Sequence, residues 1–527
     1  MKPSPYLVTI PDPACDLVIT TANAATTLNQ LSDPDLRVFC VDPGDYRSYA
    51  GRILREPGTS SSPRYLRFNG PGAVKAFERT SQAILERLDI RADWWVIQGL
   101  TFRPRSSATS RIVSLNGVQH VVLDGNLIDA IEHPNGPEQN GVTIVANTGY
   151  PASHNTVQRN VIRNGDQSHQ AIDYEGVLIA PGFNGGEDND DNRILDNEIY
   201  DWGDAIAVAG ITEDCSDPGV QHGTVIDGND AYLTPAKYVD CKTGVATSLG
   251  QCACAENGID VKADPGPDPA SWTRITNNRV WGFRPTTEAV VCGGSGANGQ
   301  AITAGTACPT DVLVARNLVS DSTIGIEVAG STWIVAGNLV HDIHASDSAP
   351  WGTMAIFLSA GSSYIAVQWN TIVNSLIAYD DASSYTDTRC NTVIRAPGWG
   401  GGLPRGVSHV TDYNYLYESS AVNFVGSTNR TFASAVDSLD PQLCYERKRW
   451  TGAVTVCVPD AATASMSPQL EGAPHCNGAI AAQFGIPKIG YWMNSGSCGL
   501  GGELVGVLAA LRWWGRRARS DGARIEG

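Results

Sequence analysis

Short apolar runs that end in an asparagine recur along the middle of the chain. Examples are VVLDGNLI (Val121–Ile128), TVQRNVI (Thr156–Ile162) and VLVARNLV (Val312–Val319). The asparagines of the full set are Asn126, Asn160, Asn197, Asn278, Asn317, Asn338 and Asn370, at intervals of 34, 37, 81, 39, 21 and 32 residues. Periods of about 20–50 residues are typical of repeat architectures, in which each unit packs mainly on its neighbours. The sequence therefore contains an imperfect internal repeat, and its long interval contains an insertion.

Each repeat predicts strands, because its apolar residues come in short runs with almost no helical periodicity. In a coil of parallel strands, inward positions carry Val, Ile and Leu, and each corner needs a residue that tolerates unusual backbone angles. Asparagine tolerates the left-handed region, and stacked asparagine amides can form hydrogen bonds along the coil axis. We therefore predict that the repeated asparagines occupy equivalent corners. The alternative is that they mark unrelated turns of a β-sandwich.

The repeated phrases resemble those of right-handed parallel β-helix proteins, the fold of pectate lyases, chondroitinase B-like lyases and many surface proteins. The resemblance covers roughly residues 60–420. It implies an all-β solenoid with capping segments and a short C-terminal hydrophobic tail. The predicted divisions are an N-terminal cap (1–60), the parallel β-helix (61–420), C-terminal coils or a cap (421–493), and a linker with the tail (494–527).

Segments outside the repeat predict a few further features. Residues Ala22–Leu31 read as a short polar helical stretch, and Ala73–Leu88 reads as a short helix or as two strands. Two long insertions, His133–His154 and Gly210–Glu256, interrupt the coils. Long loops of a solenoid gather on one face, so we expect them to border a binding site.

The length and charge of the chain narrow the range of partners. A solenoid grows along one axis, so 527 residues are compatible with one elongated domain, which we expect to be a monomer. The formal charge of −18 argues against a nucleic-acid partner and against adhesion to anionic membranes. An acidic surface also suits calcium as a cofactor.

Thirteen cysteines indicate disulfides and an oxidising compartment, since none has the spacing of a zinc site. Cys252 and Cys254 are too close to bond to each other without strain, so each is expected to pair elsewhere. The expected bridges are Cys15–Cys40, Cys292–Cys308 and Cys444–Cys457.

The C-terminus carries a cysteine, a short apolar run (Leu504–Leu511) and an arginine cluster around Arg516. The run is too short for a membrane span, which needs about 20 apolar residues. The tail resembles bacterial C-terminal sorting tails, known best from myxobacterial surface proteins. That resemblance implies processing or lipid attachment at Cys498, a secreted or cell-surface location, and membrane contact only through the tail. An amphipathic tail that packs on the fold is the alternative.

Candidate chemistry lies in AENGIDVKADPGPDP (Ala255–Pro269), where Asp260 and Lys262 are two residues apart and so share one face of a strand. Upstream, DWGDAIAVAG places Asp204 at the start of another strand. The two phrases are similar to those of calcium-dependent pectate lyases, which implies Asp204 as a calcium ligand and Lys262 as the base. The chain departs from that family at RITNNRVWG (Arg274–Gly282), where the adjacent double aspartate is absent.

Cleavage by β-elimination needs a base and a cation, which explains the interest of a lysine, an arginine and a metal-binding aspartate. Cleaving a uronate chain by β-elimination removes a proton next to the carboxylate, and a cation must neutralise the developing charge. Lys262 would be the base, and Arg284 would bind the carboxylate through two of its guanidinium N–H groups. A lysine base needs a lowered pKa, and the neighbouring Asp260, expected to contact substrate, works against this unless a metal occupies it. Lys262 could instead be an ordinary exposed lysine.

These observations predict an extracellular or surface-anchored β-helix that binds an acidic polysaccharide or a cell-surface glycan, with uronate lyase activity as the leading hypothesis. The alternative is a non-catalytic adhesion protein that uses the coil as a spacer and its loops as a binding scaffold.

Overall fold

The computed structural model describes residues 3–49, 52–70, 75–106, 110–133, 140–165, 174–181, 189–209, 221–262, 271–284, 299–304, 310–343, 353–389, 391–394, 396, 415–417, 430–432 and 443–458. The tail at 494–527 with Cys498, and the expected Cys292–Cys308 bridge, lie outside these residues. Among the residues that are described, no helix is long and apolar enough to cross a membrane.

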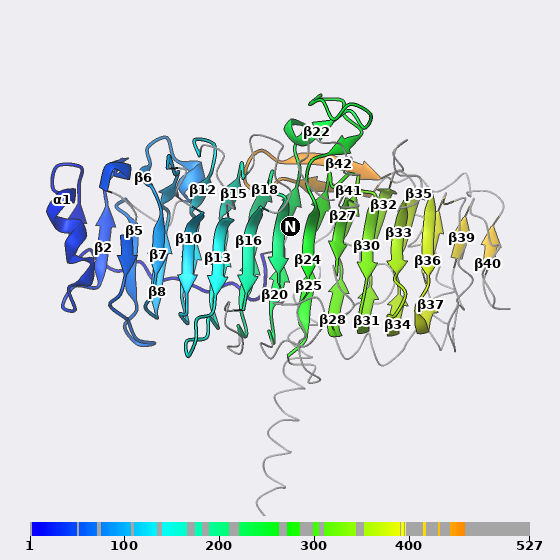
Figure 1. Cartoon of the computed structure of the whole chain (residues 1–527), viewed down its shortest axis with the longest axis horizontal. Helices are drawn as coiled ribbons and strands as arrows, with labels where there is room; N and C mark the ends of the chain where they lie inside the picture. The colour runs from blue at the N-terminus through cyan, green and yellow to red at the C-terminus, as the bar shows by residue number, and fades with distance from the viewer. Residues whose placement is uncertain are drawn as a thin grey trace, which may run out of the picture.

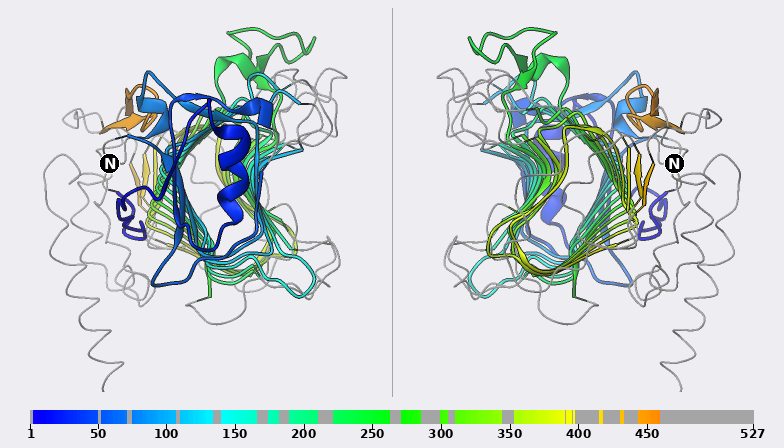
Figure 2. Two further views of the ribbon diagram at one scale, coloured as in Figure 1. Left: turned by 90° about the vertical axis from the view of Figure 1, so that its left-hand side faces the viewer. Right: turned by 90° about the vertical axis from the view of Figure 1, so that its right-hand side faces the viewer.

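Each coil of the chain adds one strand to each of three parallel sheets, which have 13, 14 and 11 strands. Successive coils stack in chain order, so the molecule is an elongated solenoid (Figure 1) whose three sides appear in the end-on views (Figure 2). The predicted right-handed parallel β-helix is confirmed.

We name the sheets A, B and C in the order in which a coil visits them. Sheet A consists of β1 (Leu17–Ile19), β2 (Val38–Val41), β5 (Arg64–Phe68), β8 (Trp95–Gln98), β11 (Val122–Asp124), β14 (Thr156–Gln158), β17 (Arg193–Leu195), β20 (Val225–Asp227), β25 (Thr273–Thr276), β28 (Thr310–Ala315), β31 (Ser331–Ala336), β34 (Ser363–Gln368) and β37 (Ser384–Arg389). Sheet B consists of β3 (Gly44–Asp45), β6 (Ala83–Leu85), β9 (Thr101–Phe102), β12 (Leu127–Asp129), β15 (Val161–Arg163), β18 (Glu198–Tyr200), β21 (Asp230–Tyr232), β26 (Arg279–Trp281), β29 (Leu318–Ser320), β32 (Leu339–Ile343), β35 (Thr371–Ser375), β38 (Thr392–Ile394), β39 (Tyr415–Tyr417) and β40 (Arg430–Phe432). Sheet C consists of β4 (Arg52–Leu54), β7 (Leu88–Ile90), β10 (Arg111–Asn116), β13 (Asn140–Val145), β16 (Glu175–Ala180), β19 (Asp204–Val208), β24 (Asn257–Val261), β27 (Gln300–Thr303), β30 (Ile324–Val328), β33 (Met354–Leu358) and β36 (Ile377–Asp381).

The repeated asparagines form a continuous ladder at the corner between sheets A and B, as predicted. The left-handed backbone that was expected of them lies one residue earlier, for example at Arg159, Asp196 and Asn277. In the first step, Nδ2 of Asn126 donates to Oδ1 of Asn160 over 3.0 Å, and the backbone N–H of Asn126 donates to the same oxygen over 2.8 Å. The same pair of bonds is repeated coil by coil as far as Asn391. The long interval of the sequence pattern contains one further member, Asn229, which bonds to Asn278.

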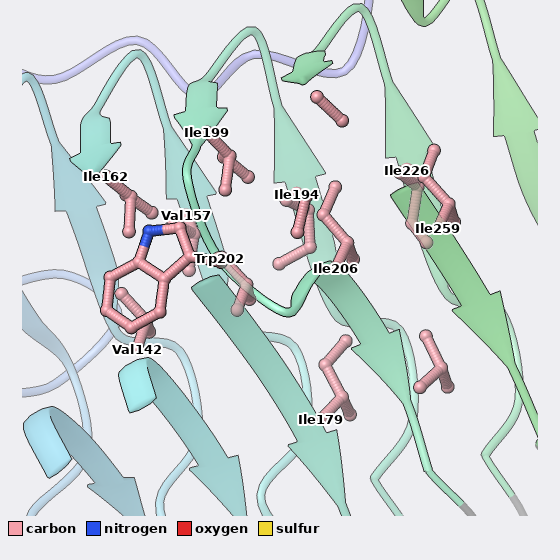
Figure 3. Close-up of a cluster of buried hydrophobic side chains, with 14 of the residues drawn as sticks. Val142, Val157, Ile162, Ile179, Ile194, Ile199, Trp202, Ile206, Ile226 and Ile259 are labelled. Atoms are coloured by element: carbon pink, nitrogen blue, oxygen red, sulfur yellow. The ribbon is translucent and has the colours of Figure 1, made fainter. Parts of the chain in front are cut away.

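The interior of the coil is filled by columns of aliphatic side chains (Figure 3). In sheet C, Ile206 aligns with Val177 on one side and Ile259 on the other, and all three are fully buried. Burying each such side chain contributes about 1.5–3 kcal/mol. Trp202, also fully buried, packs into the same cluster at the turn from sheet B into sheet C.

That turn leaves little room for side chains. A Cβ atom added at Gly258 would lie 2.3 Å from Cγ1 of Val280 and 2.4 Å from the carbonyl oxygen of Ala301. Gly141, Gly176 and Gly325 occupy the equivalent positions of other coils, each with a neighbouring atom within 2.5 Å of an added Cβ. The backbone of each coil therefore approaches its neighbour closely where the strands of sheet C begin.

A short helical segment covers the N-terminal end of the coil. Helix α1 (Ala24–Thr27) and the 3₁₀ helix η1 (Leu28–Ser32) lie across that end (Figure 2), where a helical stretch was predicted. The second expected helix, Ala73–Leu88, is instead a 3₁₀ turn, η3 (Ala76–Glu78), followed by β6 and the start of β7. The two-strand alternative is therefore correct, because the pairing of these strands with neighbouring coils overrides the weak helical spacing.

Two of the disulfides have both partners among the described residues, and two antiparallel hairpins lie outside the coil there. The predicted Cys15–Cys40 bond is present, and a Cys241–Cys252 bond closes the excursion of η4 (Pro235–Lys237), β22 (Tyr238–Val239) and β23 (Cys252–Ala253). Cys254 is also disulfide-bonded, so neither cysteine of the close pair bonds to the other. In the second hairpin, β41 (Leu443–Arg447) and β42 (Val454–Val458), the register places Cys444 opposite Cys457, whose side chains are not among those described.

Candidate functional site

Sheet C brings two of the predicted residues onto neighbouring coils. Strands β19 and β24 are adjacent and parallel, with Asp204 opposite Asn257 and Ala207 opposite Asp260. Ile259 and Val261 point into the core, where both are fully buried. Because side chains alternate along a strand, Asp260 and Lys262 lie together on the outer face.

Lys262 and Asp260 form an ion pair on this face. The Lys262 Nζ atom lies 3.0 Å from Oδ2 of Asp260, and the side chains are 37 % and 2 % exposed respectively. Burial lowers the pKa of Lys262, but the negative charges of Asp260, Asp204 and Glu256 outweigh it, so the pKa lies above its ordinary value. The ammonium group is therefore charged at neutral pH and accessible to solvent.

Asp204 is buried, like Asp260. Its Oδ1 accepts the backbone N–H of Asn257 over 2.8 Å. Burial raises the pKa of Asp204 well above its ordinary value, and repulsion from Asp260, Glu256 and Glu175 raises it further. Carboxylates that lie close together repel one another when all are charged, so Asp204 favours its neutral, protonated form. The cluster thus combines a neutral carboxyl group with a charged lysine.

The next coils extend the polar face in a way that the sequence patterns did not indicate. Thr303 of β27 lies opposite Asp260, and its hydroxyl donates to Oε2 of Glu327 over 3.0 Å. Gln300 donates to the same oxygen. Burial raises the pKa of Glu327, against the lowering effect of these two hydrogen bonds. Aligning QAIT and IGIEV in register with NGIDV would have placed these residues beside Asp260.

Asn257 adds an acceptor to this group. Its Oδ1 atom is buried and accepts no hydrogen bond within the described part of the chain, although the residue is 2 % exposed. A buried acceptor without a donor costs about 1–3 kcal/mol. The atom lies below the surface, so this acceptor is not open to a ligand in this conformation.

Arg284 is engaged elsewhere. Its Nε lies 3.1 Å from Oδ1 of Asp321 and its Nη2 lies 3.2 Å from Oδ2 of the same residue. The guanidinium stacks 4.0 Å from the ring centroid of Tyr238, and Nη1 donates to the carbonyl of Gly250. These contacts fasten the β22–β23 excursion to sheet B. The structure therefore brings Lys262, Asp260 and Asp204 together, while the catalytic role of Arg284 stays a prediction.

A metal ion is the other group that this cluster was predicted to hold. No group of three or more His, Cys, Asp or Glu side chains suited to hold a metal ion occurs within the described ranges. In the cluster, Lys262 already supplies a positive charge beside Asp260. Asp204 as a calcium ligand stays a prediction, and no step below depends on a metal.

The fold and this polar face define a class of protein, the parallel β-helices, and comparisons with solved structures lead to the same class. No protein-family model and no curated protein match the chain. The chain is similar to a mannuronic acid specific polysaccharide family 6 lyase from human gut microbiota, with a TM-score of 0.51, 12% identity, and coverage of 80% of this chain and 91% of that one.

Two further similar structures have lower scores. One is a family 6 alginate lyase in complex with a trisaccharide, with a TM-score of 0.46, 10% identity, and coverage of 83% and 89% of the two chains. The other is pectate lyase Pel9A, with a TM-score of 0.40, 11% identity, and coverage of 75% and 82%. At these identities the likeness shows the fold, and the chain shares the parallel β-helix of polysaccharide lyases.

Proposed function

We propose that this chain is a carbohydrate-active β-helix protein that binds an acidic polysaccharide on the outer face of sheet C and cleaves it by β-elimination. The observation that carries the proposal is the Lys262 ammonium, half-exposed and 3.0 Å from the buried Asp260, at the centre of a carboxylate cluster. The fold shared with a mannuronic acid specific lyase supports the substrate class.

The uronate carboxylate is the group that makes the neighbouring C5–H acidic. Because Asp260, Asp204 and Glu256 raise the pKa of Lys262, only a small fraction of the amine is neutral at neutral pH, and that fraction is the base. In the elimination, the neutral form of Lys262 takes the C5 proton, the C4=C5 double bond forms, and the C4–O glycosidic bond breaks. The leaving oxygen takes a proton from solvent. Asp260 orients the amine. Calcium, where present, would supply further charge to neutralise the carboxylate.

The raised pKa of Lys262 makes the elimination rate depend on pH. Only the neutral amine is a base, and its fraction grows as the pH rises toward the pKa. We therefore expect kcat/KM to rise throughout the alkaline range without a plateau near neutral pH. A bell-shaped profile centred below pH 7 would contradict a lysine base.

The proposed location is extracellular or on the cell surface, with membrane contact only through the tail after Cys498. The disulfides Cys15–Cys40 and Cys241–Cys252 support an oxidising compartment.

The direct test is ultraviolet absorbance during incubation with alginate, polygalacturonate or chondroitin, with and without calcium, because the C4=C5 bond conjugated to the carboxylate absorbs. Lys262→Ala is expected to lower the rate by about 10²–10⁴-fold. Lys242→Ala, at an exposed lysine of the β22–β23 excursion, is the matched control and should leave the rate unchanged.

Two results would each favour another function over the proposed lyase activity. New reducing ends without absorbance would indicate hydrolysis by the carboxyl groups of the cluster. No product from any of the three polymers, with and without calcium, would favour the non-catalytic adhesion role.

A further inference from the structure

A second polar site lies away from Lys262, at the corner between sheets A and B. A pocket of about 380 Å³ opens there between the N-terminal residues 3–10, the coil surface and the β41–β42 hairpin. This volume lies within the range of about 300–1,000 Å³ that is typical of ligand pockets. Figure 1 shows the hairpin lying along the outside of the solenoid. The pocket is therefore built by three parts of the chain that are distant in sequence.

The charged groups that line the pocket are mostly basic, although the chain as a whole carries −18. They are Lys75, Arg159, Arg279, Lys448, Arg449 and Asp196. A local cluster of positive charge on an acidic protein creates an attractive field for anions at that point only.

One cation of the pocket has no carboxylate partner among the described residues. The other four have an ion-pair partner each, and these pairs are Lys75–Glu78, Arg159–Asp124, Arg279–Asp230 and Arg449–Asp196. A further carboxylate, Glu198, accepts the backbone N–H groups of Trp450 and Thr451. Lys448 forms no ion pair with any described residue, and its Nζ lies 5.7 Å from the ring centroid of Tyr232. Its ammonium group is therefore the cation that remains available to an anionic ligand.

The remaining walls favour a sugar ring over a bare ion. Trp450 lines the pocket together with Leu7, Pro3 and Ala453. The indole N–H of Trp450 donates to the carbonyl of Asp196 over 3.0 Å, and the Lys75 ammonium lies 3.4 Å from its ring centroid. These bonds fix the indole in place. An apolar, aromatic wall beside basic groups matches a saccharide that has a C–H face and a carboxylate.

We propose that this pocket binds a carboxylated sugar residue of a uronate-containing chain, with Lys448 and Arg159 receiving the carboxylate and Trp450 contacting the ring. The pocket lies on another side of the coil from Lys262, so it holds the polymer without taking part in its cleavage. This inference is independent of lyase activity, because binding here does not require Lys262.

The test is isothermal titration calorimetry of the full chain carrying Lys262→Ala, which removes turnover and the cation of the sheet C site. A uronate trisaccharide is expected to bind, and the neutral glucose trisaccharide is not. Lys448→Glu should weaken uronate binding by about 10- to 100-fold, since a charge-assisted hydrogen bond contributes about 1.5–3 kcal/mol. Lys448→Gln, which removes the charge and keeps a polar side chain, should give a smaller loss. Lys242→Glu, a charge reversal at an exposed site, should leave the affinity unchanged.

Circular dichroism of each variant separates loss of binding from loss of the hairpin fold. Unchanged affinity in both Lys448 variants would overturn the proposal, and so would equal affinity for the neutral trisaccharide. Competition by sulfate at the same concentration as the trisaccharide would overturn the sugar assignment and leave a simple anion site.

Discussion

The asparagine ladder shows how a single side chain stabilises three coils. Asn197 donates through Nδ2 to Asn229 Oδ1 over 3.0 Å and to the carbonyl of Val157 over 2.8 Å. Its Oδ1 accepts two bonds from Asn160. All these groups are buried, so removing the amide leaves several of them without partners.

We therefore expect Asn197→Ala to lower the stability of the coil by about 2–5 kcal/mol, the cost of leaving two or more buried groups unpaired. Thermal unfolding followed by circular dichroism measures the change. The control is Asn147→Ala, because Asn147 is exposed and bonds to another side chain at the surface. An equal midpoint for the two variants would contradict a structural role for the ladder.

Ionising the Asp204 carboxyl group at neutral pH is unfavourable in the folded protein. Its folded-state pKa lies well above the ordinary value, first because of burial and then because of Asp260. A carboxyl group with a raised pKa stabilises the fold at pH values below its unfolded pKa, and that stabilisation is lost as the pH rises through its folded pKa. The ionised form is thus the destabilising one.

Asp204→Asn keeps the acceptor for the Asn257 N–H and removes the charge. We expect the variant to raise the melting temperature by a few degrees at pH 8 and by less at pH 5, measured by differential scanning calorimetry. Asp35→Asn, at an exposed aspartate, should show no such pH dependence. A lower melting temperature of Asp204→Asn at pH 8 would mean that the ionised group is favourable in the fold.

At the scale of single elements, glycine is the second residue of four strands of sheet C, β13, β16, β24 and β30. Gly258 directly follows Asn257 and lies against Val280 and Ala301 of neighbouring strands. Its close contacts fix the distance between coils where the candidate site begins.

Gly258→Ala is expected to cost about 1–3 kcal/mol, because an added methyl group forces backbone shifts in a packed interior. It should also lower the lyase rate by more than the loss of folded protein explains, because β24 carries Asp260. Thermal melts and the absorbance assay measure both. The control is Gly149→Asn, where the left-handed backbone (φ 77°) is open to solvent and asparagine tolerates that conformation. Wild-type stability and activity in Gly258→Ala would show that the coils can separate without cost.

The elements of the coil were largely predictable, and the contacts between distant segments were not. The asparagine phrases predicted the strands because each phrase is local and repeated. The sequence pattern missed Asn229, which is separated from Asn278 by 49 residues that include the β22–β23 excursion. Arg284 was expected to bind the substrate carboxylate at the Lys262 site. Lys262 follows a strand of sheet C and Arg284 follows a strand of sheet B, and sequence order alone does not show this difference. The docking of Trp450, 252 residues from Glu198, has no local signal at all.

At the scale of the whole molecule, the N-terminal cap keeps the solenoid from extending by end-to-end association with other copies. Leu28 and Leu31 of η1 are buried against the first coil. A parallel coil without such a cover exposes both apolar side chains and unpaired strand edges.

Leu31→Asp is therefore expected to detach the cap, since burying an unpaired carboxylate is strongly unfavourable, and to produce oligomers that grow with concentration. Size-exclusion chromatography with light scattering measures the mass. Gln30→Asp, on the exposed side of the same segment, should remain at the mass of the wild type. A Leu31→Asp protein of wild-type mass at high concentration would show that the cap does not limit association.

Asp196 joins segments that are made at very different times. Its Oδ2 accepts the N–H of Ser4, 192 residues earlier, over 3.0 Å, and its carbonyl accepts the Trp450 indole N–H, 254 residues later. At about 5–20 residues per second, the first of these contacts waits on the order of 10–40 s of synthesis, and the second waits about as long again. The early coils can stack while residues 3–10 are still unattached. The basic pocket is therefore incomplete until residues 448–453 have been synthesised, so a nascent chain can hold a polymer there only after they have left the ribosome.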